Sequence, residues 1–331
     1  FKNSDNTTSV NFNGTFLNER DGTPLFDLNT AKLIQERAAR RRNEREPLPR
    51  MPKLEDERSW TSNLFRRDSD LVDFAVTLST AEDQTAVAPG YLTREWSENG
   101  RRFFRYEMDK PINNFFSFQS ARYSKVEDDW NGVTLQVFHH PMHDYNVDRM
   151  IEAMKSSLDY YTRAFTPFQY QQMRILEFPR YERFAQSFAN TVPFSESIGF
   201  VADLRDPKDI DIVYYVTAHE VAHQWWGHQI VPAGVQGSTM LVETFAQYSA
   251  LMVMKALYGE HAMRRFLKNE LDRYLTGRAS EPEMPVYRVE DQQYIHYRKG
   301  SLVMYALQDR VGEAVVNRSL KRFLEEWAYK T

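Results

Sequence analysis

The stretch HEVAHQWWG occupies residues 219–227 and follows an apolar run, DIDIVYYVTA, that is typical of a buried helix. Residues four apart share one face of a helix, so the imidazoles of His219 and His223 can bind one metal ion from the same side. Glu220 lies beside them, where its carboxylate can take a proton from a water molecule bound to that ion. The stretch therefore predicts one zinc ion on the two histidines, with Glu220 as the catalytic base.

Glu243 is the predicted third ligand, because catalytic zinc needs three protein ligands and an open fourth position. A loop with Pro232, Gly234 and Gly237 follows the first helix, and a second helix is predicted from about Ser238. Glu243 then falls about one and a half turns into that helix, and an antiparallel helical hairpin would return it to the two histidines. Its sequence neighbours are apolar, and a carboxylate in such surroundings needs a cation, which argues against an ordinary surface position.

The rest of the chain predicts an α+β fold in three regions. Residues 1–64 are interpreted as an extended arm and a polar helix, the helix covering residues 31–46 and expected to be solvated. Residues 65–145 alternate apolar and polar side chains between turn signals, which predicts an antiparallel, sandwich-like β domain. Residues 146–331 change to helical spacing and predict a mainly helical domain.

Composition excludes several classes of function. The chain has no cysteine, so disulfides, cysteine-ligated zinc, iron–sulfur clusters and thiol catalysis are excluded. Lys and Arg total 42 against 46 Asp and Glu, and the net charge of −4 argues against nucleic acid as the main partner. No apolar run reaches the roughly 18 residues of a membrane-spanning helix. The chain begins with Phe1 and without a signal-peptide pattern, and is interpreted as a soluble piece of a longer polypeptide.

The residues around the histidine motif resemble the zinc aminopeptidases typified by aminopeptidase N and leukotriene hydrolase, which belong to the gluzincins. HEVAHQWWG resembles the family pattern HExxHQW[FW]G, and ETFAQY at 243–248 resembles the segment that supplies the family's zinc glutamate. The resemblance covers residues 65–331 and implies part of an N-terminal β domain, then a thermolysin-like catalytic domain. Nineteen residues separate His223 from Glu243, against the family's usual eighteen, and Val242 and Thr244 replace the usual Asn and Gly.

Two further motifs carry the resemblance. YRKG at 297–300 resembles the family's YEKG segment, which implies that Tyr297 donates a hydrogen bond to the oxyanion of the transition state. A packing role would fit Tyr294 equally well, but the Lys-Gly pair follows Tyr297. PFSESIG at 193–199 stands where the family carries its GxMEN motif, which implies that Glu196 binds the free α-amine of a peptide.

The other histidines are not expected to bind the catalytic metal. FHHPMHD contains three histidines within five residues, but its proline breaks the spacing, and a surface turn is favoured over a second metal site. Two more histidines lie close to the motifs and are expected to line the cleft without acting as ligands. These histidines are His139, His140 and His143 in the turn, and His228 and His296 near the cleft.

Taken with the resemblance, the motifs imply a zinc-dependent aminopeptidase that acts on peptides. Two alternatives stay open: an endopeptidase of thermolysin type, which the nineteen-residue spacing allows, and a non-catalytic, zinc-bearing module of a transporter that senses peptides. TVPFSESIGF at 191–200 and HEVAHQWWGH at 219–228 resemble the subgroup fused to bacterial ABC-type permeases. That resemblance implies the extramembrane domain of a bacterial membrane protein, with the permease in the same polypeptide as a partner.

Overall fold

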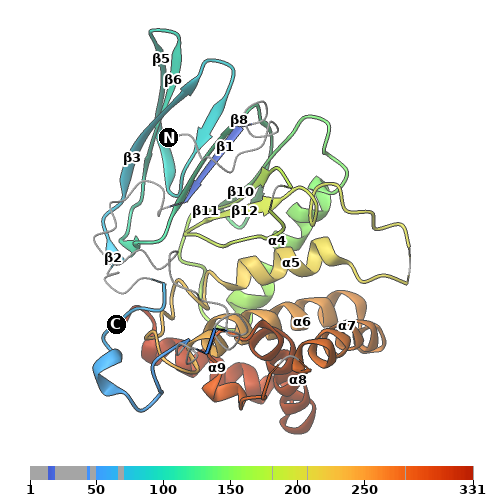
Figure 1. The fold of residues 1–331 in the computed structure, drawn as a ribbon. Helices are drawn as coiled ribbons and strands as arrows, with labels where there is room; N and C mark the ends of the chain where they lie inside the picture. Colours follow the sequence, from blue (N-terminus) through green and yellow to red (C-terminus); the bar gives the residue numbers. More distant parts are fainter. Residues whose placement is uncertain are drawn as a thin grey trace.

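A computed structural model describes residues 14–18, 43–44, 50–65, 71–180, 182–206, 208–279 and 281–330. Figure 1 shows a β-rich part formed by the N-terminal half of the chain and a helical part formed by the C-terminal half. This arrangement confirms the predicted α+β class. The polar helix predicted at 31–46 lies outside the described residues, apart from a turn at 43–44.

Three small antiparallel sheets form the β-rich part. Their orders are β1-β8-β4, β3-β6-β5 and β2-β7. Side chains of β3 and β6 alternate between solvent and the core, as the period-two pattern predicts for a half-buried sheet. The strands are β1 (Gly14–Asn18), β2 (Leu71–Val72), β3 (Ala75–Ala81), β4 (Thr85–Val87), β5 (Tyr91–Glu98), β6 (Arg101–Glu107), β7 (Ile112–Asn113) and β8 (Ser117–Ala121), with a 3₁₀ turn η2 (Glu57–Ser59) before them.

A fourth sheet, in the order β12-β11-β10-β9, connects this region to the helices. Its strands are β9 (Ser124–Trp130), β10 (Val133–His139), β11 (Gln172–Phe178) and β12 (Thr191–Ser195). The pair β9–β10 is an antiparallel hairpin, whereas β10, β11 and β12 run parallel, and every residue of β11 is buried. The sheet thus includes strands from both sides of residue 145, where a domain boundary was predicted, and the division into domains stays a prediction.

The segment 185–188 turns back beside β12. Isolated bridges join Ala185 to Phe194 and Phe188 to Thr191 in antiparallel register. This segment therefore lies along β12 on the side away from β11.

Helices dominate the part of the described chain outside these sheets, where loops connect them. They are α4 (Val147–Ala164), α5 (Ile212–Ala222), α6 (Phe245–Tyr258), α7 (Glu260–Arg278), α8 (Gly300–Val311) and α9 (Glu313–Trp327), with π-helical segments η3 (Met240–Thr244) and η5 (Tyr294–Lys299) and a 3₁₀ turn η4 (Val286–Arg288). Helix α5 packs between α4 and α6 and is buried almost all round, as its continuous apolar run predicts. Trp225 and Trp226, fully buried just beyond α5, belong to the core that joins these helices.

Helix α7 occupies a polar stretch that the hydrophobic pattern does not mark as a separate helix within the mainly helical region 146–331. Within the described residues, no helix combines the length and the apolar character needed to cross a membrane.

Candidate active site

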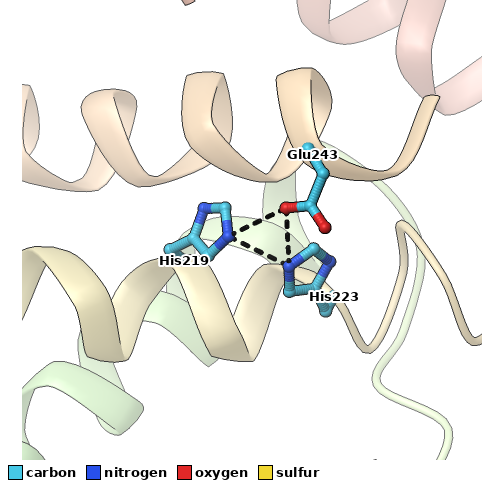
Figure 2. Close-up of side chains that lie close together, drawn as sticks. All are labelled: His219, His223 and Glu243. Carbon is cyan, nitrogen blue, oxygen red and sulfur yellow. Dashed lines mark hydrogen bonds and ion pairs between the residues drawn. The ribbon is translucent and has the colours of Figure 1, made fainter. Parts of the chain in front are cut away.

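Three predicted ligands meet at the end of α5. His219 lies in its last turn, His223 directly follows it, and Glu243 reaches down from η3, which lies across α5 (Figure 2). The two Nε2 atoms are 3.0 Å apart, and Glu243 Oε2 is 3.4 Å from each. Donor atoms about 2.1 Å from a tetrahedral zinc ion lie about 3.4 Å from one another. The three atoms are therefore spaced to hold one such ion.

Protonation in this cluster depends on burial and on the shared glutamate. Burial and the neighbouring His223 lower the pKa of His219 to about 4. Burial also lowers that of His223, but the charge and hydrogen bond of Glu243 outweigh it and raise the pKa to about 9. The two histidines hold the pKa of Glu243 well below its usual range, although burial opposes them. The negative charge of Glu243 and the two imidazoles are thus strongly coupled.

Polar atoms without a partner fit a missing cation. Among the described residues, the buried side-chain atoms with no hydrogen bond include Glu220 Oε2 and Glu243 Oε2. Buried polar atoms normally have partners, so such a group marks a place where a ligand belongs. His223 Nδ1 lies 2.9 Å from the carbonyl oxygen of Trp226 and can donate to it, which directs the Nε2 lone pair of the neutral ring toward the other two ligands. The donor set of two imidazoles and one carboxylate suits catalytic zinc.

A buried carboxylate and a half-buried phenol lie beside the cluster. Glu220 and Tyr297 line the same cavity of about 130 Å³ as His223 and Glu243. Burial raises the pKa of the Glu220 carboxyl to about 7, close to that needed for proton exchange at neutral pH. The ring of Tyr297 lies 5.6 Å from that of His219, and burial raises its pKa well above the ordinary value, so the phenol keeps its proton. The site thus contains both a proton acceptor and a hydrogen-bond donor.

Tyr297 rather than Tyr294 faces this cavity. Both belong to η5, but Tyr294 stacks on Tyr274 in a small separate core. Thr244 of η3 donates a hydrogen bond of 2.5 Å to the carbonyl oxygen of His296. At Gly300 an added Cβ would lie 2.3 Å from Thr244 Oγ1, so the glycine permits the close approach of η5 to η3. Contact between η3 and η5 therefore brings the tyrosine to the glutamate.

Glu196 is not among the residues lining the cavity. Its carboxylate lies 3.9 Å from His143 Nδ1 and 3.7 Å from Arg180 Nε, beyond the end of β12. Neither His143 nor Arg180 lines the cavity. The structure therefore does not bring this predicted amine-binding residue to the metal cluster.

The cavity walls come from residues that the sequence analysis did not identify. The segment 185–187 forms one wall, and Ser187 donates a hydrogen bond of 2.8 Å to the carbonyl oxygen of Glu220. Phe65 and Phe115 form another, with stacked rings 4.8 Å apart. No motif marked either set, because both reach the site through long-range packing.

The two histidines expected near the cleft differ in position. His228 lines the cavity, and its Nε2 lies 3.1 Å from the carbonyl oxygen of Ser187, so it is engaged away from the cluster. His296 is buried against the ring of Tyr297, with centroids 4.7 Å apart, and does not line the cavity. Neither joins the group of three ligands, as expected.

Comparisons with known proteins agree on one family. A model of the Peptidase family M1 domain matches residues 145–331. The chain is similar to "Probable aminopeptidase 1" of Sulfurisphaera tokodaii, with 25% identity over 189 residues, which cover 54% of this chain and 24% of that protein. It is also similar to endoplasmic reticulum aminopeptidase 2 of Homo sapiens, with 24% identity over 210 residues, which cover 60% of this chain and 22% of that protein. The chain thus spans about a quarter of the length of these relatives.

Solved structures show the same fold. The M1 zinc metallopeptidase from Deinococcus radiodurans superposes with a TM-score of 0.60 at 19% identity, covering 79% of this chain and 58% of that one.

Proposed function

The chain belongs to peptidase family M1, and from this premise we propose that it is a zinc aminopeptidase, which removes residues from the free N-termini of peptides. One observation carries the proposal: His219, His223 and Glu243 converge within 3.4 Å of one another beside the cavity that Glu220 and Tyr297 line. Relatives named as aminopeptidases support the substrate class.

His219, His223 and Glu243 would hold one zinc ion. When bound, zinc would polarise the scissile carbonyl and make the attacking water more acidic. Glu220 accepts the proton of that water and passes it to the leaving amine, a task suited to a carboxyl whose pKa burial raises to about 7. Tyr297, which keeps its proton, donates a hydrogen bond to the oxyanion as the carbonyl carbon becomes tetrahedral.

The shape of the cavity favours an exopeptidase over an endopeptidase. An endopeptidase needs a groove through which a chain can pass on both sides of the cleaved bond. Here Phe65 and Phe115 stack on one another at the cavity, and Phe115 also contacts Phe188 at 4.6 Å. This aromatic wall bounds one side of the cavity, which supports a site that receives the end of a peptide. The group that binds the free amine is left unassigned, since Glu196 does not line the cavity.

A sensing module without catalysis would have no need of a buried general base. Placing the Glu220 carboxyl at 6% exposure costs free energy, because burial opposes its ionised form. The presence of the Tyr297 phenol beside this group supports catalysis rather than binding alone.

A membrane-linked origin is a separate proposal, supported by the resemblance of residues 191–200 and 219–228 to the permease-fused subgroup. Its test is fractionation of the full-length polypeptide from its source cells. Recovery with the membranes is expected, and recovery in the supernatant would contradict the link.

The test of the main proposal measures metal content and peptide cleavage together. Zinc is quantified after dialysis, and release of the first residue is followed on paired peptides with free and N-acetylated termini. Cleavage of only the free peptides, by a protein that holds zinc on the three ligands, is expected. Equal cleavage of both would indicate an endopeptidase, and zinc without cleavage would indicate a binding module.

A further inference from the structure

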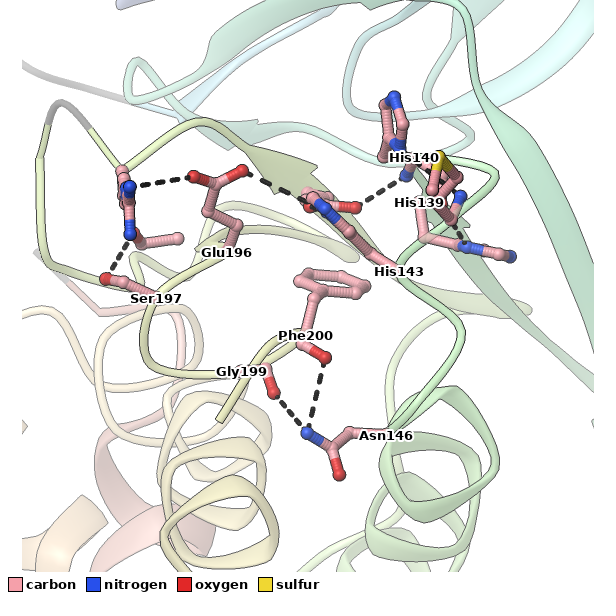
Figure 3. A network of polar contacts seen from close by, with 12 residues as sticks. His139, His140, His143, Asn146, Glu196, Ser197, Gly199 and Phe200 are labelled. Carbon is pink, nitrogen blue, oxygen red and sulfur yellow. Dashed lines mark hydrogen bonds and ion pairs between the residues drawn. The ribbon is translucent and has the colours of Figure 1, made fainter. Parts of the chain in front are cut away.

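A second group of metal-ligating side chains lies at the carboxyl ends of the parallel strands. Strands β10, β11 and β12 end at His139, Phe178 and Ser195. His143 follows the first of these strands, Glu177 lies near the end of the second, and Glu196 comes directly after the third (Figure 3). In open sheets with parallel strands, ligands bind in the crevice outside these ends.

The three side chains converge on one point. His143 Nδ1 contacts Glu177 Oε1 and lies 3.9 Å from Glu196 Oε2, and the three donor atoms lie within 4.8 Å of one another. The second oxygen of Glu177 accepts the backbone N–H of His140 at 2.5 Å, which fixes the orientation of the carboxylate. The cluster is therefore held by backbone structure and not only by mobile side chains.

The charges of the cluster call for a cation. The Glu177 side chain is only 5% exposed and that of Glu196 18%, and both face the same imidazole. Two carboxylates with one neutral imidazole would leave two negative charges close together, and a protonated imidazole would balance only one. Arg180 contacts Glu196 from the outside but is 76% exposed, so that ion pair contributes little.

We propose that His143, Glu177 and Glu196 bind a second divalent transition-metal ion, of the Zn²⁺ or Mn²⁺ type. One imidazole nitrogen with two carboxylate oxygens suits these ions. Donors around such an ion lie roughly 3.0–3.4 Å apart, so binding requires His143 to move away from Glu177 and toward Glu196, with the two carboxylate oxygens at a similar separation. The bound ion would tie the turn before α4 to the ends of β11 and β12.

This site is independent of the proposed catalytic function, since it shares no residue with the first cluster. The ion would be structural, and its test is a count of metal ions rather than an activity. Asp144 provides a matched control, because it is an exposed carboxylate on the same turn and adjacent to His143.

The experiment measures zinc per chain after equilibrium dialysis against buffered micromolar Zn²⁺. Wild type is expected to hold two ions, Glu196→Gln one, Asp144→Asn two, and His223→Ala one. In the His223→Ala background, a Mn²⁺ titration followed by electron paramagnetic resonance reports the second site alone. There Glu196→Gln is expected to weaken Mn²⁺ binding at least tenfold. Circular dichroism checks that each variant is folded.

One ion in wild type, retained by Glu196→Gln and lost in His223→Ala, would overturn the proposal. So would Mn²⁺ binding that Glu196→Gln and Asp144→Asn weaken equally, since that pattern reports only surface charge. Either result would identify the cluster as a group of polar side chains that binds no metal ion. Neither would bear on the catalytic proposal, which stands or falls with the ion lost in His223→Ala.

Discussion

Replacing Arg298 by methionine is expected to lower the free energy of unfolding by about 3–5 kcal/mol, the cost of removing one partner from a buried ion pair. Glu270 of α7 is fully buried, and Arg298 Nη1 donates to its two oxygens at 3.1 and 2.9 Å. Methionine retains the length of the side chain but leaves the carboxylate with neutral donors, Tyr215 at 3.3 Å and Asn269 at 3.1 Å. Neutral hydrogen bonds contribute only about 1 kcal/mol each, so they do not replace the charge.

The assay is urea unfolding followed by tryptophan fluorescence, because Trp225 and Trp226 report on the core that joins the helices. Glu270→Gln in the Arg298→Met background removes the stranded charge and is expected to recover 1 kcal/mol or more, on the order of the coupling typical of contacting residues. Lys268→Met on the same helix breaks only an exposed pair with Asp272 and should change stability by less than about 0.5 kcal/mol.

A loss below about 1 kcal/mol for Arg298→Met would refute the reasoning, since it would mean that water reaches Glu270. A double variant no more stable than the single one would refute it as well, because the penalty would then come from packing and not from charge.

Glu220→Gln is expected to leave zinc content unchanged and to lower kcat by about 10²–10⁴-fold, as peptide hydrolysis assays would show; near-normal turnover would exclude it as the base. Tyr297→Phe should lower kcat by about 10²-fold or more with little change in KM, and a change confined to KM would indicate a binding role. Chelation of zinc should lower the free energy of unfolding by about 4 kcal/mol if the free ion exceeds Kd 1,000-fold, measured by urea titration with and without chelator. Tyr161 is fully buried and its pKa is raised well above the ordinary value of 10.0, so its contribution to stability is complete below pH 10 and is lost as pH rises further. Of the loss of stability above pH 10, Tyr161 should account for up to about 1.4 kcal/mol per pH unit in unfolding titrations, and an unchanged slope in Tyr161→Phe would contradict this contribution.

The meeting of His219 with His223 was predictable because their spacing is local. His219 and His223 share a helix face whatever the rest of the chain does, and the buried run before them indicated that helix. Glu243 required one tertiary assumption, the return of a second helix, which the apolar flanks of the glutamate supported. Tyr297 required the resemblance, since Tyr294 fits the periodicity equally well.

The cavity walls and the position of Glu196 were not predictable in the same way. Strand order depends on pairings between distant segments, and nothing in 185–188 indicates that it turns back beside β12. The motif around Glu196 therefore predicts an amine-binding residue in the cleft, although the side chain does not line the cavity. Helix α7 was missed because few of its side chains are buried, and one of these, Glu270, is charged.

Glu243 and Tyr297 both belong to π-helical segments, where each turn closes over one residue more than in an α-helix. Such a turn can accommodate one inserted residue without shifting the helix that follows. Helix α6 can therefore keep its packing when the segment before it is one residue longer. Removing a residue from an ordinary α-helix would instead rotate its neighbours by about 100°. The nineteen residues between His223 and Glu243, against eighteen in the family pattern, then need not signify a different kind of peptidase. The number of residues between two ligands is therefore a poor criterion for the type of peptidase when a π-helical turn lies between them.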